Sequence, residues 1–382
     1  MRPVIPVFWR PLLLFTALAL WPGLLQDSGG PAGHLLLFVV CGLGLVPLAV
    51  GLSNLVERLV ARLGPRLGGL LSVLLGNIVE FLVAFNALSS GLYPLVAMSI
   101  AGAVVINCLP VLGIGIMIAC RDRDAVPLDP INQELANQQL LISAILLALP
   151  SVFINQPISD ALQGNSSNDS FSLYSTLVAV LALIVYGLGV LQGQRGAAAP
   201  YKGAEPPTEE SQARVPLLPL LVALTGLIAL TGAVSERLVG SLDLLVEGAH
   251  LSPLFVGLFL LPLFGCLPEA LVAWRAAARR DTPLLITSTI ESSLQLLLFV
   301  LPLLVLCGLP LGRHLHLGLP SVALAALAIA MVMIERITAN HSFNSFEGVQ
   351  LIALFAALAL GSLLLINPEA AAASGLSRLG GP

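Results

Sequence analysis

The chain has 382 residues, of which 57% are hydrophobic and only 10% charged, with a net charge of −4 and a mean hydropathy of +0.97. A soluble globular domain carries about 25% charged residues, so this composition excludes an ordinary soluble protein and indicates a multi-pass membrane protein. The five cysteines are scattered and form no CxxC pair, which favours buried thiols over a metal or redox site.

Eleven apolar segments are candidates for membrane-spanning helices, because a span needs about 20 predominantly apolar residues. They are residues 11–25, 34–54, 68–90, 94–119, 139–155, 171–192, 215–234, 251–274, 283–307, 319–335 and 349–366. The first segment follows Arg2 and Arg10 but lacks a small-residue cleavage site, so we expect a retained helix and not a signal peptide. The sequence predicts an all-α integral membrane protein with 11 transmembrane helices.

The distribution of positive charge supports this helix count. With the N-terminus in the cytoplasm, 14 of the 17 Lys and Arg residues fall on the cytoplasmic side and 3 on the other. Cytoplasmic loops of membrane proteins carry such an excess of positive charge. We therefore expect a cytoplasmic N-terminus and a C-terminus on the opposite side. The short loops suit a bacterial inner membrane.

One segment in the middle of the chain, residues 193–214, has the Pro, Gly, Ala and Glu content of a linker. It separates a predicted first repeat, 34–192, from a second, 215–366, while 1–33 form an extra N-terminal helix with its connection and 367–382 a C-terminal tail. Each repeat contains five helices. Because five is odd, the two halves enter the membrane in opposite directions, which predicts the inverted repeats that recur in transporters.

Each half carries a glutamate inside an apolar helix, four residues after a glycine, and an amide in the next helix. The amide follows the glutamate by 27 residues in the first half and by 26 in the second. The matching residues are Gly76, Glu80 and Asn107 in the first half and Gly265, Glu269 and Gln295 in the second. The duplication therefore extends to the polar residues inside the membrane.

An ionised carboxylate at the bilayer centre costs about 2.5–3.5 kcal/mol, a cost that is avoided by protonation or by binding a cation. If Glu80 and Glu269 meet, they can hold one divalent metal ion, or protons when the ion is absent. These two states exclude each other, as a cation/proton antiporter requires. No Arg or Lys lies within the predicted spans to pair with either glutamate, which disfavours a purely structural role.

Calcium prefers six to eight oxygen ligands, more than two carboxylates supply. The amides of Asn77, Asn107 and Gln295 can add side-chain oxygens, although amides within membranes also serve as interhelical hydrogen-bonding groups. Main-chain carbonyls become ligands where a helix is broken, and Gly76, Gly265 and Pro268 favour such breaks. These residues complete the predicted cation and proton site.

The motif GNIVEFLVAFNAL, residues 76–88, resembles the first motif of the calcium/proton exchangers of the cation/calcium antiporter superfamily. Residues 292–306 and 346–360 are similar to later segments of that family. The resemblance implies eleven helices, a first helix outside two inverted five-helix repeats, and a G-N-A-x-E motif in each repeat whose glutamate binds calcium. It also implies that calcium and protons are the transported partners, with no cofactor and no nucleic acid.

The second motif departs from the family pattern. Cys266 stands where the family has Asn, Pro268 directly precedes the glutamate, and Ala270 replaces a His. Conversely, Glu291 stands where the family usually has Gly, one helical turn before Gln295. We hypothesise that Glu291 supplies a third carboxylate to the site; the alternative is that it faces a polar vestibule.

Other functions fit the sequence less well. A sodium/calcium exchanger, or an exchanger of another divalent ion such as manganese, is the nearest alternative, but Ala103 and Ile106 occupy positions that are often Ser, which disfavours sodium sites. An intramembrane enzyme needs a nucleophile or a His/Asp metal cluster within the spans, and the sequence shows neither, so we expect no enzymatic activity. Two unequal repeats suit alternating access better than a symmetric channel.

Overall fold

The structure, a computed structural model, describes residues 7–21, 31–128, 130–154, 166–196, 217–249 and 251–364. The described part of the chain is almost entirely helical, with one pair of very short strands. The predicted tail lies outside the described residues, as does the predicted linker apart from its first residues, which belong to the end of a helix.

The first half contains the following elements: η1 (Val7–Leu12), α1 (Leu13–Ala19), α2 (Pro31–Gly76), α3 (Ile78–Ser89), α4 (Tyr93–Ile106), η3 (Asn107–Val111), α5 (Leu112–Ala119), β1 (Val126–Pro127), α6 (Pro130–Ile154) and α8 (Ser166–Gly196). The second half contains α10 (Leu217–Ala249), α11 (Pro253–Phe255), η4 (Val256–Leu260), α12 (Leu261–Gly265), α13 (Leu267–Ala278), α14 (Thr282–Ile286), η5 (Thr287–Glu291), α15 (Ser292–Gln295), η6 (Leu296–Val300), α16 (Leu301–Gly308), η7 (Leu309–Leu311), α17 (Ser321–Thr338), β2 (Ser342–Phe343) and α18 (Ser345–Leu364).

Seven helices of the described residues are long and apolar enough to cross a membrane. An eighth span results if two bent segments, Val256–Gly265 and Leu267–Ala278, which meet at 62°, are counted together. Two shorter apolar helices, Trp9–Ala19 and Ile78–Ser89, accompany them. The chain is thus a nearly all-α protein with the helices of an integral membrane protein.

One predicted boundary was wrong. We expected separate helices at 34–54 and 68–90, but α2 continues from Pro31 to Gly76, and the interruption lies at Asn77. The helix continues through Gly64 and Pro65, between the two predicted segments, although the candidate span within it ends at Leu63. Hydropathy reports where a helix meets lipid and not where its hydrogen bonding ends.

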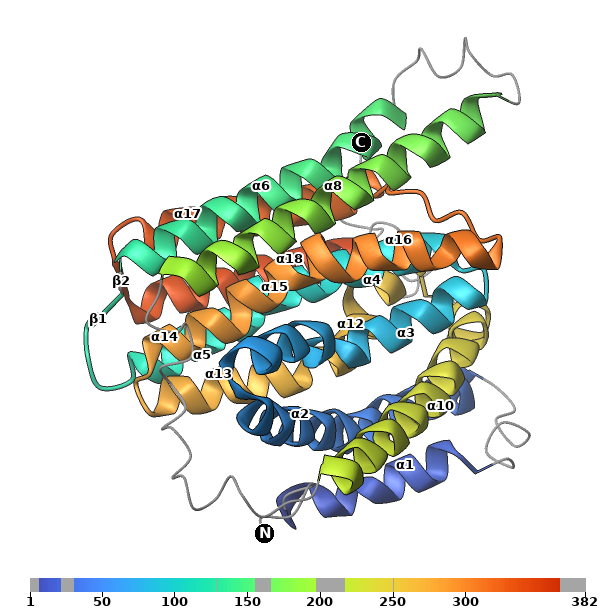
Figure 1. The fold of residues 1–382 in the computed structure, drawn as a ribbon, viewed down its shortest axis with the longest axis horizontal. Coiled ribbons are helices and arrows are strands. Elements are labelled where there is room, and N and C mark those ends of the chain that lie inside the picture. The colour runs from blue at the N-terminus through green and yellow to red at the C-terminus, as the bar shows by residue number, and fades with distance from the viewer. Residues whose placement is uncertain are drawn as a thin grey trace, which may run out of the picture.

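The helices form three groups in space (Figure 1). Helices α1, α2 and α10 pack against one another at one side, and α6, α8 and α17 lie at the opposite side. Between them run α3, α4 and α5 of the first half and α12 to α16 of the second. Both glutamate motifs belong to this middle group, so lateral layers of apolar helices flank them.

The two halves repeat the same local interruptions. Helix α2 ends at Gly76 and α3 resumes two residues later; α12 ends at Gly265 and α13 resumes two residues later. Helices α3 and α13 each have 12 residues. A π-helical turn then begins 27 residues after each glutamate, at Asn107 in η3 and at Leu296 in η6. Single π-helical turns are rare and frequently lie at functional sites.

The middle group is tightly packed where α4 crosses η4. A Cβ atom added at Gly102 would lie 2.0 Å from the carbonyl oxygen of Leu258, closer than any side chain tolerates. Small residues at helix crossings let backbones approach in this way inside membranes. Gly102 therefore fixes the separation between α4 and the helix that leads to the second motif.

Segments of the two halves also meet outside the spans. Strand β1 pairs antiparallel with β2, with Val126 opposite Phe343. Leu128 donates its main-chain N–H to the carbonyl of His341 at 2.9 Å, and the guanidinium of Arg280 lies 3.5 Å from the carboxylate of Asp122. These contacts join three connecting segments at one end of the helices.

Candidate functional site

Glu80 lies in the first turn of α3, directly after the interruption at Asn77, and its side chain is only 7% exposed. It lines a small cavity with Ser99, Ala103 and Gly265 that has room for about one water molecule. A Cβ atom at Gly265 would lie 3.2 Å from the Oε1 atom of Glu80. The glycine of the second motif therefore leaves the space that the carboxyl group of the first motif occupies.

Glu269 occupies the equivalent place in α13, in the first turn after the interruption at Cys266. The two glutamates lie within electrostatic range of each other. No Arg or Lys of the described residues pairs with either carboxyl group. The N-terminal end of a helix favours negative charge, so both helices face the pair with their positive ends. The structure thus brings Glu80 and Glu269 together from distant parts of the chain.

The Oε2 atom of Glu269 is buried and has no hydrogen-bond partner among the described residues. A buried polar atom left unsatisfied costs about 1–3 kcal/mol, and more when it is charged. No group of three or more His, Cys, Asp and Glu side chains in the described part of the chain could hold a metal ion. Any further ligands to an ion bound at the pair must therefore be amide, hydroxyl, main-chain or water oxygens.

The amides of Asn77 and Gln295 are hydrogen-bonded to each other. The Nδ2 atom of Asn77 donates to the Oε1 atom of Gln295 at 2.8 Å, and Ser292 donates its hydroxyl to the Oδ1 atom of Asn77 at 3.0 Å. Both predicted ligand oxygens thus already accept a hydrogen bond. In this conformation the Asn77–Ser292–Gln295 network holds the first helix interruption, beside Gly76, against α15.

Sequence reasoning missed Ser292, although its position signals the contact. It lies three residues before Gln295, so the two side chains share one face of the helix. A hydroxyl on the same face as an amide, inside a span, indicates a polar contact with a neighbouring helix.

The amide of Asn107, by contrast, has no hydrogen-bond partner among the described residues. Asn107 begins η3, is 1% exposed, and both polar atoms of its amide are buried. One turn before it, the carbonyl of Ala103 accepts the thiol of Cys266 at 3.7 Å; four residues after it, the carbonyl of Val111 accepts the indole N–H of Trp274 at 3.0 Å.

These two contacts fix the register of α13 along η3. Ala103 and Val111, which make these contacts, lie four residues before and four residues after Asn107. On the other helix, Ala270 is midway between their partners, Cys266 and Trp274. Asn107 therefore stands opposite the turn that contains Glu269. Asn107 and Glu269, which both have buried polar atoms without partners among the described residues, therefore belong to the same part of the interface.

The thiol of Cys266 is buried at the interruption of the second motif, in the place that Asn77 has in the first. Its long contact with a main-chain carbonyl replaces the two side-chain hydrogen bonds of Asn77. Pro268 follows within the first turn of α13, where a missing N–H leaves no hydrogen bond unmade. The two helix interruptions are therefore alike in backbone and different in polarity.

Glu291 does not join the pair in this conformation, so the hypothesis of a three-carboxylate group is not supported by the arrangement of the described residues. It is half-buried at the end of η5 and interacts electrostatically with Tyr186 of α8. Glu291 lies one helical turn before Gln295, whose side-chain oxygen accepts a hydrogen bond from Asn77.

Comparisons with known proteins agree on one family. The family described as "Sodium/calcium exchanger protein" matches residues 33–192 and 219–364. A Ca2+/H+ antiporter of Synechocystis sp. is 29% identical over 352 residues, which cover 86% of this chain and 91% of the relative. A Ca2+/H+ antiporter of Aphanothece halophytica is 29% identical over 342 residues, covering 85% and 89%.

The fold is also similar to solved structures. The crystal structure of the Ca2+/H+ antiporter protein YfkE matches with a TM-score of 0.75 and 22% identity, covering 94% of this chain and 99% of that one. At this identity the match demonstrates the fold alone. The family match, which covers most of the chain and includes both glutamate motifs, demonstrates more: the chain belongs to the sodium/calcium exchanger protein family.

Proposed function

We propose that this protein is a secondary antiporter that exchanges calcium for protons by alternating access, with Glu80 and Glu269 as the shared binding site. The observation that carries the proposal is the meeting of two carboxyl groups, one from each half of the chain, at two helix interruptions, with no basic partner among the described residues. The names of the curated relatives, Ca2+/H+ antiporter, support the same substrates.

The chemistry of exchange follows from the cost of burying charge. Two ionised carboxylates inside an apolar protein repel each other and lack solvation, so they are stable only with a divalent cation or with protons. Bound calcium displaces the protons, and protons displace calcium. Because one site holds either substrate but not both, each passage of calcium is linked to a passage of protons in the other direction.

Asn107 is the amide that we assign to the bound cation. It lies opposite Glu269 and is the candidate ligand whose oxygen has no donor among the described residues. Asn77 and Gln295 instead hold the first interruption in place, and the backbone carbonyls released near Gly76 and Gly265 supply further oxygens. Calcium would then reach its preferred six to eight ligands with water completing the shell.

We further propose the membrane arrangement expected from the sequence: eleven spans, with inverted five-helix repeats at 34–192 and 215–366. The repeated interruptions after Gly76 and Gly265, and the π-helical turns 27 residues after each glutamate, support two repeats. The excess of Arg and Lys on one side supports a cytoplasmic N-terminus, and bacterial relatives support the inner membrane of a bacterium.

An exchange of sodium or manganese is the alternative within this family. Sodium coupling needs more oxygen ligands beside the glutamates, and the helix that faces Cys266 offers the apolar side chains of Ala103 and Ile106 there. A family of exchangers also favours transport over enzymatic catalysis.

The test is calcium uptake into inverted membrane vesicles energised by a pH gradient, with wild type compared with Glu80→Gln and Glu269→Gln. We expect uptake that consumes the gradient in wild type and a loss of uptake in both variants. Glu335→Gln, which removes an exposed carboxylate in the last turn of α17, is the control. Wild-type vesicles that move sodium or manganese but no calcium would contradict the substrate; uptake retained in both Gln variants would contradict the site.

A further inference from the structure

Glu291 is a carboxylate that the Glu80–Glu269 pair does not use. It is half-buried, nine residues inside the span Thr282–Leu311, and no ion pair or hydrogen bond of its side chain is found among the described residues. A glutamate inside a span without a counter-ion is a functional residue by default, because burying it unpaired is costly.

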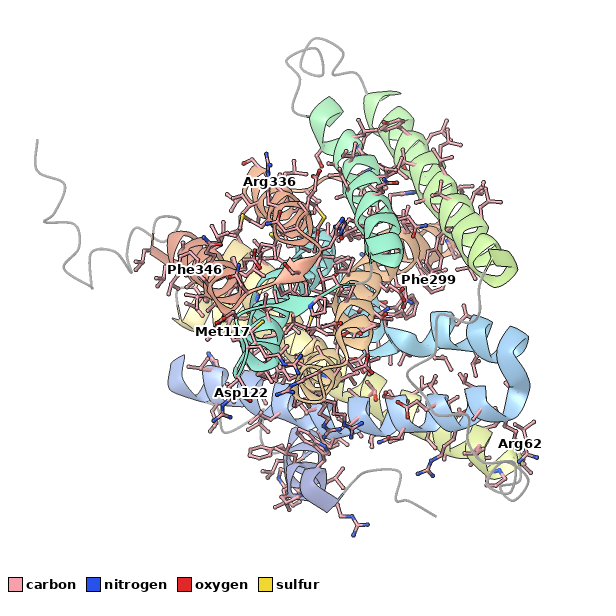
Figure 2. The ribbon with its side chains drawn as sticks, turned by 90° about the vertical axis from the view of Figure 1, so that its left-hand side faces the viewer. Arg62, Met117, Asp122, Phe299, Arg336 and Phe346 are labelled. Carbon is pink, nitrogen blue, oxygen red and sulfur yellow. The ribbon has the colours of Figure 1, made fainter. Side chains whose placement is uncertain are left out.

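Tyr186, on another helix, lies within electrostatic range of this carboxylate. Its side chain is 8% exposed, its ring packs on Phe299 with 5.7 Å between the ring centroids, and its hydroxyl has no hydrogen-bond partner among the described residues. Figure 2 labels Phe299 where the helix of the second half meets α6 and α8. Glu291 lies about two turns before Phe299 and interacts electrostatically with the same tyrosine. Tyr186 therefore lies beside the helix that carries Glu291.

The pair formed by Glu291 and Tyr186 adjoins the network beside the main site. Ser292 directly follows Glu291, and Gln295 lies one turn further; both are bound to Asn77, three residues before Glu80. Polar side chains therefore continue from Glu291 to the interruption that carries Glu80. On the far side, the span begins next to Arg280, which the proposed orientation places in the cytoplasm.

We propose that Glu291 and Tyr186 form an access site, which attracts the transported divalent cation from the cytoplasmic side and holds it before it reaches Glu80 and Glu269. One carboxylate and one phenolic oxygen are too few to dehydrate calcium, which wants six to eight oxygens. The cation is therefore held weakly, with most of its water, and passes on. This inference rests on the proposed function.

The experiment measures the KM for calcium in inverted vesicles, where the cytoplasmic face is outside, and then in right-side-out vesicles. Removing a charge that concentrates the cation at the entrance should raise KM about tenfold in Glu291→Gln and leave kcat within about twofold. Tyr186→Phe keeps the ring on Phe299 and should raise KM less. Both effects should be confined to the cytoplasmic face.

Glu335→Gln is the matched control, because Glu335 is an exposed carboxylate near the same end of the neighbouring span α17. If KM rises equally in this variant, then KM depends on surface charge in general and not on Glu291, and the access site is overturned. A KM unchanged in Glu291→Gln would also overturn it, and a loss of kcat would instead make Glu291 a ligand of the main site. Glu291→Gly, with the residue typical of the family, provides a second variant if Glu291→Gln does not fold.

The outcomes separate this inference from the proposed function. Wild-type vesicles without calcium/proton exchange would end the proposed function and, with it, the access site. Normal exchange in wild type, lost in Glu80→Gln but unaltered in Glu291→Gln, would end the access site alone.

Discussion

The amide of Asn77 donates a 2.8 Å hydrogen bond to Gln295, a residue 218 positions later in the chain. This contact crosses from the interruption between α2 and α3 to the helix that follows the second motif. Ser292 adds a second hydrogen bond to the same amide. The backbone around Glu80 is therefore held by the other half of the protein, and its geometry depends on both halves.

Replacing either amide should destabilise the protein, but replacing both should cost less than the sum. Asn77→Ala and Gln295→Ala each leave a buried polar partner unsatisfied, which costs about 1–3 kcal/mol, whereas the double variant removes both partners. The measurement is the thermal unfolding midpoint in detergent. Thr176→Ala is the control, since that hydroxyl donates only to a carbonyl of its own helix. Additive losses would show that the two amides do not interact.

Alanine at Gly265 should impair transport without preventing folding. The added Cβ would lie 3.2 Å from the Oε1 atom of Glu80, so the carboxyl group must shift by a few tenths of an ångström. Small displacements of reacting groups can lower rates by about a hundredfold, and we expect a loss between about ten- and a hundredfold. Calcium uptake by the purified protein in liposomes measures it. Gly226→Ala, in open space, should transport normally; equal losses in both would point to helix packing instead.

Leucine at Asn107 should make the protein more stable and inactive. The substitution removes an amide whose two polar atoms are buried without partners, so stability should rise by about 1–3 kcal/mol while a cation ligand is lost. Asn86→Leu should have the opposite effect on stability, because Asn86 donates to the carbonyl of Gly232 and the hydroxyl of Ser235. Thermal unfolding and calcium uptake are compared in both variants. A destabilised Asn107→Leu would mean that water or another group satisfies the amide.

Stability should fall in mild acid because of His316, which lies between the spans. Burial, together with the neighbouring His314, lowers the pKa of His316 below its ordinary value of 6.5. The folded state therefore favours the neutral ring, so its contribution is present above pH 6.5 and is lost as the pH falls through the lower folded-state value.

His316→Phe, which keeps a ring against Phe171, should reduce the difference between unfolding midpoints measured at pH 7.5 and pH 5. His341→Asn should leave the difference unchanged, because His341 is exposed and Asn tolerates its positive φ of 52°. An undiminished acid sensitivity in His316→Phe would assign the effect to another group.

The sequence predicted the helical membrane class and the two glutamates, because apolar length and an unpaired charge are local properties. It did not predict that α2 continues to Gly76, since the fall in hydropathy after residue 54 marks the end of an apolar stretch and not the end of helical hydrogen bonding. Nor did it predict which amides would bind each other. In a sequence, Asn77, Asn107 and Gln295 are equivalent as sources of ligand oxygens. Only packing distinguishes the two that are hydrogen-bonded to each other from Asn107, whose amide has no partner among the described residues.

The separation of Glu291 from the glutamate pair has a similar cause. Its spacing from Gln295 indicated the same helical face, from which we hypothesised a third carboxylate in the site, with a polar vestibule as the alternative. The chain there alternates between α- and π-helical turns, in η5, α15 and η6, and each π-helical turn shifts the direction of the side chains that follow it. A regular helical period cannot anticipate such shifts.

The pairing of β1 with β2 has a consequence for how the polypeptide can be made. Val126 and Phe343 belong to different halves, and so do the amide of Asn137 and the hydroxyl of Thr338, which are hydrogen-bonded to each other. Together with the contact of Asn77 and Gln295, these contacts join the two halves independently of the polypeptide that connects α8 to α10. Two separately translated fragments, divided between residues 196 and 217, therefore carry the complementary surfaces needed to assemble into one exchanger.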